Sequence, residues 1–229
     1  MPIAPRYFIT GTDTEVGKSI ATAQLLRCLN KNNIRAVGMK PAASGCIQHG
    51  DILINDDVEL HRQASPIQAP LALVSPYRFL PPISPHLAAH EAGVQIDLSH
   101  LIDCANQLNV YADTVLIEGA GGWFAPLSDS LRIADLAVAL EAPVILVVGM
   151  RLGCINHALL SVQSILSSGL PLAGWIANQV DPNMARHAEN LDYLSKNIPA
   201  PLLAEIEFNP LAREGCLNEK AIIHLQLQK

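Results

Sequence analysis

The fold is decided by residues 6–19, which read Arg6-Tyr-Phe-Ile-Thr-Gly-Thr-Asp-Thr-Glu-Val-Gly-Lys-Ser19. They predict a short apolar strand that runs into a loop ending in Gly17-Lys18-Ser19, which is a phosphate-binding loop signature. In such a loop, backbone N–H groups and the dipole of the following helix attract phosphate oxygens. The Lys18 charge would lie against the β- and γ-phosphates, and the Ser19 hydroxyl would be a Mg²⁺ ligand.

This loop departs from the commonest pattern by one residue. Five residues rather than four separate Gly11 from Gly17, and Thr12 takes the usual place of the first glycine. The alternative interpretation is a glycine-containing surface turn before a helix. Apolar residues at helical spacing follow the loop, and this strand, loop and helix context favours nucleotide binding.

Composition favours one domain built around a buried sheet. Of the 229 residues, 50% are apolar and only 16% are charged, which suits a sheet covered on both faces. No linker rich in glycine, serine or proline divides the chain. We therefore predict that residues 1–229 form a single domain.

Charge and cysteine content restrict the partners and the location. A formal charge of −6 without a basic cluster argues against nucleic acid as the main partner. The longest clean apolar run, residues 144–148, is far too short to span a membrane, and the first residues lack a secretory signal pattern. The five cysteines lack metal-ligand or CxxC spacing. These features predict reduced thiols in a cytoplasmic protein with no membrane partner.

Strand and helix patterns alternate along the rest of the chain. Further strands are predicted at 35–39, 113–118, 144–148, 172–177 and 202–206, and helices at 20–30, 97–108, 134–140, from the loop at 151–157 to about 168, and at 184–197. This order predicts an α/β fold of the P-loop NTPase type, a parallel sheet with helices on both faces. Residues 46–99 are less regular and contain a proline-rich run, and a long insertion of this kind usually shapes a site.

Several polar residues stand where strands end or a helix begins. Lys40 follows the second strand, at the edge where parallel sheets bind ligands, although a solvated surface lysine is the alternative. Glu118 ends the next strand like a Walker B acid and could serve Mg²⁺ beside Ser19; the alternative is a solvated strand terminus. Asp56 and Asp57 open a short helix, where a helix-capping role is the alternative to a site role.

Taken together, the motifs resemble those of dethiobiotin synthetase, a family of ATP-dependent ligases in biotin synthesis. The match covers nearly the whole chain and runs through residues 11–19, 40–45, 76–77, 84–86, 118–124, 152–157 and 174–178. The resemblance implies that 7,8-diaminopelargonate, CO₂ and ATP give dethiobiotin, ADP and phosphate, with Mg²⁺ required. In that family one substrate amine becomes a carbamate, the carbamate takes the γ-phosphoryl group, and the second amine closes the ureido ring.

The resemblance also implies roles for individual residues. Lys18 and Lys40 would be catalytic, stabilising negative charge on the carbamate and the transferring phosphoryl group. The Asn178 amide would read the adenine, since it can both donate and accept. Substrate contacts would come from Thr14, Ser44 and Asn156, Mg²⁺ ligands would be Ser19, Asp57 and Glu118, and ATP contacts would come from Glu15, Val16, Gly17, Lys18, Ser19, Ile20, Asp57, Glu118, Gly119, Ala120, Gly121, Asn178, Gln179, Glu207, Phe208, Asn209 and Glu214.

Two departures from the family pattern concern the nucleotide base. Gln179 stands where an acid is expected and Glu207 where a proline is expected, so base selectivity is less secure than phosphate binding. The resemblance further implies a homodimer in which residues 152–156 of one subunit complete the active site of the other. The alternative is that Asn156 caps its own helix.

Two other functional classes fit parts of the pattern. A switch-type ATPase of the partition or septum-placement kind would carry a signature lysine at position 13, where this chain has Asp13. An enzyme similar to cobyrinic acid amide synthase would carry an added glutaminase domain, for which 229 residues leave no room.

Overall fold

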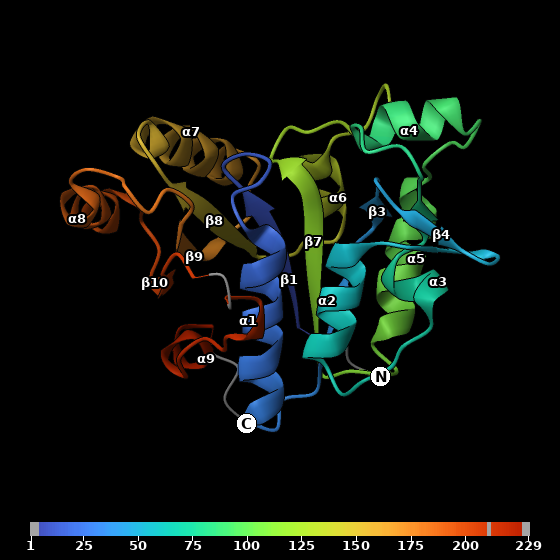
Figure 1. Cartoon of the computed structure of the whole chain (residues 1–229), viewed down its shortest axis with the longest axis horizontal. Coiled ribbons are helices and arrows are strands. Elements are labelled where there is room, and N and C mark those ends of the chain that lie inside the picture. Colours follow the sequence, from blue (N-terminus) through green and yellow to red (C-terminus); the bar gives the residue numbers. More distant parts are fainter. Residues whose placement is uncertain (1–4, 210–211, 226–229) are drawn as a thin grey trace.

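A six-stranded sheet forms the centre of the computed structural model, which describes residues 5–209 and 212–225 (Figure 1). Its strand order is β10-β9-β8-β1-β7-β2, and all neighbouring pairs are parallel. The predicted parallel α/β fold is thereby confirmed. The strands are β1 (Arg6–Gly11), β2 (Ala36–Met39), β7 (Thr114–Gly122), β8 (Val144–Met150), β9 (Leu172–Gln179) and β10 (Leu202–Ile206).

Helices cover both faces of the sheet, as expected for strands that are apolar on both sides. Successive residues of β1 point to opposite faces: Ile9 packs in a buried cluster with Leu25 of α1, and Phe8 in another with Leu101 of α5 and Ile133 of α6. In Figure 1, α1 and α2 lie in front of the sheet and α6 lies behind it. The helices are α1 (Lys18–Lys31), α2 (Asp56–Ala64), α3 (Leu71–Val74), α4 (Pro85–Glu91), α5 (Leu98–Leu108), α6 (Ile133–Ala139), α7 (Cys154–Ser167), α8 (His187–Asn197), η1 (Ala212–Glu214) and α9 (Lys220–His224).

The segment between β2 and β7 contains small elements that were not predicted individually. Two-residue strands β3 (Ala42–Ala43) and β6 (Tyr77–Arg78) pair in parallel, and β4 (Ile47–His49) forms an antiparallel hairpin with β5 (Ile52–Ile54). The pairing of β3 with β6 brings the proline-rich run beside the end of β2. No helix in the described ranges has the length and apolar character needed to cross a membrane.

The sheet reverses its strand order at β1. From β1 the chain passes through α1 to the edge strand β2, returns to β7 beside β1, and then continues to β8 on the other side of β1. Ligands of open α/β sheets bind outside the carboxyl ends of the strands at such a point. The sequence prediction was wrong at one end here, because β7 does not stop at Glu118; it continues to Gly122, which pairs with Gly11.

Candidate active site

The loop between β1 and α1 has a backbone that requires glycine at its end. Gly17 is the N-cap of α1 with φ of 84°, in the left-handed region, and no side chain caps the helix. A Cβ atom at this position would come within 2.1 Å of Asn178 Nδ2. Glycine therefore satisfies both the conformation and the space. The first N–H groups of α1 remain available to an anion, as a phosphate-binding loop needs.

Lys18, the first residue of α1, is folded back onto its own loop. Its Nζ atom donates a hydrogen bond to the Asp13 carbonyl at 2.9 Å, and only 6% of the residue is exposed. Burial, reinforced by the nearby charge of Lys40, lowers the pKa of Lys18 to about 8. A phosphate bound in the loop would place negative charge beside this ammonium group and raise the pKa of Lys18.

Glu118 lies at the centre of a buried polar cluster, with no exposed surface. Lys40 Nζ lies 2.5 Å and Ser19 Oγ 2.8 Å from its Oε1 atom, while Thr22 Oγ1 lies 2.8 Å and His61 Nε2 3.0 Å from Oε2. Although burial alone would raise the pKa of Glu118, Lys40 and His61 hold it well below its ordinary value. The carboxylate is therefore ionised and fully paired, and the alternative of a solvated strand terminus is wrong.

Lys40 is buried between two carboxylates. Besides Glu118 it contacts Asp57 Oδ2 at 3.0 Å, and only 6% of the residue is exposed. Burial opposes its charge, but Glu118 and Asp57 more than compensate and raise the pKa of Lys40 above its ordinary value. The alternative of a solvated surface lysine is wrong, and Lys40 is a fixed cation at any physiological pH.

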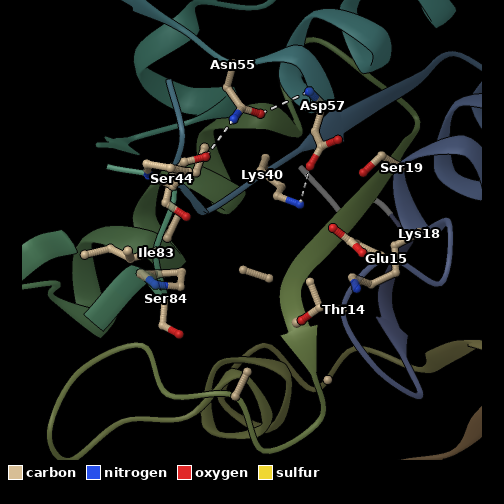
Figure 2. A pocket seen from close by; sticks show the side chains of 18 of the residues that line it. Thr14, Glu15, Lys18, Ser19, Lys40, Ser44, Asn55, Asp57, Ile83 and Ser84 are labelled. Carbon is tan, nitrogen blue, oxygen red and sulfur yellow. Dashed lines mark hydrogen bonds and ion pairs between the residues drawn. The ribbon is translucent and has the colours of Figure 1, made fainter. Parts of the chain in front are cut away.

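The start of α2 connects Lys40 to the opposite wall of the site (Figure 2). Asn55 Oδ1 accepts hydrogen bonds from the N–H groups of Asp57 and Val58, at 3.0 and 3.3 Å. Its Nδ2 atom donates to the Ser44 carbonyl at 3.1 Å. The helix cap is thus Asn55, so the alternative that Asp56 or Asp57 caps this helix is wrong. Asp57 lies in the first turn, with its carboxylate directed toward Lys40.

One cleft of about 900 Å³ at the carboxyl edge of the sheet is lined by Lys18, Lys40, Asn55 and Asp57. Figure 2 shows Lys40 between the loop that carries Thr14 and Lys18 and a far wall that carries Ser44 and Ser84. The proline-rich run contributes residues 82–85 to the lining, as expected of a site-shaping insertion. The predicted site residues that line the cleft are Thr14, Glu15, Gly17, Lys18, Ser19, Ile20, Lys40, Ser44, Asp57, Ala120 and Gly121.

Comparisons with known proteins show the family of this chain. The family model described as AAA domain matches residues 5–214. ATP-dependent dethiobiotin synthetase BioD 1 of Escherichia coli O157:H7 is 47% identical over 203 residues, covering 89% of this chain and 90% of that protein. The BioD protein of Ralstonia nicotianae is 46% identical over 206 residues, 90% of each chain. The chain belongs to the dethiobiotin synthetase family.

Solved structures of lower similarity support the fold alone. The MinC:MinD cell division protein complex of Aquifex aeolicus aligns with a TM-score of 0.59 at 15% identity, over 97% of this chain and 94% of that one. A ParA family ATPase of Chlorobium tepidum aligns with a TM-score of 0.55 at 14% identity, over 99% of this chain and 93% of that one. This chain thus shares its overall fold with these proteins.

The oxygen donors predicted to hold Mg²⁺ are suited to that ion. Asp57 Oδ2 and Glu118 Oε1 both lie within 3.0 Å of the Lys40 ammonium nitrogen, so they converge on a position that already accepts a cation. The Ser19 hydroxyl contacts the same Glu118 oxygen. In the described part of the chain, no three His, Cys, Asp or Glu side chains form a ready-made metal site. Mg²⁺ commonly needs no such cage, because one or two carboxylates, waters and substrate phosphates complete its shell.

Other residues predicted to contact ATP lie beside or beneath the cleft. Asn178 is buried against Gly17, and its Nδ2 atom donates to the Val16 carbonyl at 2.9 Å, so in this structure it supports the phosphate loop. Gln179 Oε1 accepts from the Phe208 N–H at 3.2 Å, which ties the end of β9 to residues 207–209. Outside the cleft lining lie Val16, Glu118, Gly119, Asn178, Gln179, Glu207, Phe208, Asn209 and Glu214.

Asn156 is exposed on α7 and does not line the cleft. The N-cap of α7 is Gly153, with φ of 94°, so the alternative that Asn156 caps its helix is wrong. Sequence reasoning missed Thr22 and His61, which complete the Glu118 cluster. Their only signals in the sequence were their places one helical turn after predicted site residues, Thr22 after Lys18 and His61 after Asp57.

Proposed function

We propose that this protein catalyses the ATP-dependent formation of dethiobiotin from 7,8-diaminopelargonate and CO₂, releasing ADP and phosphate. Family membership at 45–48% identity to dethiobiotin synthetases supports this activity. The structural observation that carries the proposal is a pair of buried lysines, Lys18 and Lys40, which follow different strands and line one cleft. A volume of about 900 Å³ has room for nucleotide phosphates beside a small substrate.

The chemistry requires negative charge to be held at two places. A substrate amine attacks CO₂ and loses a proton to give a carbamate, whose oxygen then attacks the γ-phosphorus of ATP with ADP as the leaving group. The second amine attacks the carbamoyl carbon, and phosphate leaves as the ring closes. We assign Lys18 to the phosphates and Lys40 to the carbamate side, where fixed cations stabilise charge that grows in the transition state.

Lys40 is suited to that role because the carboxylates of Glu118 and Asp57 keep its ammonium group protonated. We assign Ser19, Asp57 and Glu118 as the residues that would hold Mg²⁺, which when bound neutralises charge on the β- and γ-phosphates. Thr14 and Ser44 face each other across the cleft from different loops (Figure 2), and we assign both to the substrate. The ATP base would meet Asn178, Gln179 and residues 207–209 at the ends of β9 and β10.

The decisive assay measures ADP formation by purified protein with and without diaminopelargonate, together with mass detection of dethiobiotin. We expect ADP formation to depend on diaminopelargonate and Lys18→Ala to lose about 10²–10³ in turnover, the scale of one lost transition-state donor. A switch-type ATPase would ignore diaminopelargonate, and an amidotransferase would require glutamine. Either behaviour would overturn the proposal.

We also propose a homodimer in which residues 152–156 complete the partner's site. The start of α7 would offer the positive end of the helix dipole to a substrate carboxylate, and Gly153 provides no side-chain cap there. Large apolar side chains are exposed nearby, with Leu152 93%, Leu160 58% and Phe124 57% accessible. Apolar surface of this kind marks protein interfaces.

The five free cysteines support the cytoplasm as the place of action.

Subunit mixing tests the shared site. When Lys18→Ala and Asn156→Ala subunits are refolded together, a mixed dimer has one site with both lesions and one site with neither. Random pairing makes half of the dimers mixed, so activity should return to about a quarter of wild type. If Asn156 acts within its own subunit, both sites of a mixed dimer stay damaged and mixing restores nothing.

A further inference from the structure

The two oxygens of Glu118 are contacted by two different kinds of residue. Oε1 faces Lys40 and Ser19, both of which line the cleft. Oε2 faces Thr22 and His61, which are 0% and 2% exposed and lie outside the cleft lining. Oε1 therefore contacts residues that line the cleft, while Oε2 contacts residues of the protein interior.

His61 reaches Glu118 because of the way α2 packs on the sheet. It follows Asp57 by four residues, so both side chains lie on one face of α2 and reach the same cluster. The helix approaches β2 at Gly38, where an added Cβ would come within 2.9 Å of His61 Cβ and 3.1 Å of Leu26 Cδ1. A glycine at position 38 thus leaves the space in which the imidazole lies.

The contact has a defined donor. An ionised carboxylate only accepts hydrogen bonds, so His61 Nε2 must carry the proton that it shares with Oε2. The other ring nitrogen, Nδ1, is buried and has no hydrogen-bond partner within the described residues. The imidazole therefore directs its only hydrogen bond in this part of the structure to Glu118.

We propose that His61 is a positioning residue that fixes Glu118 Oε2 and thereby keeps Oε1 directed toward Ser19 and the cation position in the cleft. The inference deepens the proposed function, because it rests on Glu118 as a Mg²⁺ ligand. Carboxylates that bind metals are themselves commonly held by such outer partners, whose removal costs about 10–100-fold in metal affinity. With His61 absent, Thr22 alone would hold Oε2, and the carboxylate could turn about its terminal bond.

The test compares His61→Leu, which removes the donor, with His61→Gln, whose amide can place a donor near the position of Nε2. Mn²⁺ binding in the presence of ADP, followed by electron paramagnetic resonance, reports the site without turnover. We expect His61→Leu to weaken Mn²⁺ binding by about tenfold or more and His61→Gln to restore most of it. Val58→Ala is the matched control, because Val58 is also a buried α2 residue but its side chain is apolar and belongs to the hydrophobic core. The Mn²⁺ affinity of this variant should equal that of wild type.

A nuclear magnetic resonance spectrum of the metal-free protein gives an independent readout. We expect a hydrogen-bonded imidazole N–H signal that disappears in both His61 variants and shifts in Glu118→Gln. If His61→Leu binds Mn²⁺ as wild type does, or His61→Gln is no better than His61→Leu, the positioning role is wrong. The metal assignment fails separately, if Glu118→Gln itself leaves Mn²⁺ affinity unchanged.

Discussion

Exchanging Lys40 for methionine removes a buried charge while preserving most of the side-chain volume. The lysine and Glu118 form an ion pair at 2.5 Å, with side-chain exposures of 7% and 0%. Removing one partner of such a pair leaves an uncompensated buried charge, which costs about 3–5 kcal/mol of unfolding free energy. The second partner, Asp57, is 41% exposed, so its ion pair contributes only about 0–1 kcal/mol. Nearly all of the loss should therefore come from Glu118.

Removing the charge of Glu118 instead should cost less free energy of unfolding. Glu118→Gln leaves Lys40 beside Asp57, whose exposed carboxylate keeps the ammonium paired. In the double variant Lys40→Met/Glu118→Gln no buried charge remains unpaired, so its cost should fall below the sum of the single costs by about 2 kcal/mol, within the range measured for residues in one network.

Urea unfolding without nucleotide or Mg²⁺, followed by circular dichroism, measures all three variants on one scale. Arg186→Gln is the matched control, because it breaks an ion pair with Glu189 whose side chains are 82% and 59% exposed. That control should change stability by no more than about 1 kcal/mol. If the Lys40 and Glu118 costs add within about 0.5 kcal/mol, the two residues are not energetically coupled and the reasoning is refuted.

Three further changes test the nucleotide side of the cleft. Gly17→Ala forces a Cβ against Asn178, so calorimetry should find ATP binding strongly weakened while circular dichroism finds the fold kept; normal affinity would contradict this. Lys18 in the free protein loses its proton as pH rises through about 8, so ATP affinity should decline across that pH. Lys18→Arg should remove the decline. If the variant shows the same pH profile as wild type, the decline belongs to another group. Gln179→Ala releases the Phe208 N–H, so the KM for ATP should rise with kcat little changed, and a fall in kcat alone would place Gln179 in the chemistry instead.

The central strands were predictable because their side chains carry the signal. Residues 144–148 form most of β8, since a strand buried on both faces must be apolar. Residues 202–206 coincide with the edge strand β10, in which Leu203 and Ile206 are buried. The end of β7 was missed because residues 119–122 are glycine and alanine, which carry little hydropathy signal. Their pairing depends on Gly11 in another strand, which no local pattern reports.

Short elements were missed for a related reason. Strands β3 and β6 have two residues each, too few to show an alternating pattern. They are joined by hydrogen bonds between segments far apart in sequence. The short helix α9 buries Ala221 and Ile222 against the face that carries α1, but five residues give no sustained helical periodicity. Tertiary packing, rather than local preference, creates such elements.

Among the site residues too, some were predictable from the sequence and others were not. Lys18, Ser19 and Glu118 were predictable because a phosphate-binding loop has Lys and Ser where its helix begins, and a Walker B strand carries an acid. The inner partner His61 was not, because its contact depends on how closely α2 approaches Gly38. A motif specifies the atoms that touch a ligand, whereas the residues behind them are specified by the packing of this particular chain.

Asp13 separates this protein from the switch ATPases that share its fold. The signature lysine expected of that class would fall at position 13, and here an acid pairs with Arg151 at 2.6 Å, joining the phosphate loop to the loop after β8 in the same subunit. Both side chains are 40–49% exposed, so the pair adds at most about 1 kcal/mol to stability. Its effect is on charge rather than on stability. Position 13 carries no cation, and the Asp13 carboxylate is paired with Arg151. We therefore propose that the positive charge at the phosphates comes from Lys18, with Lys40 on the carbamate side.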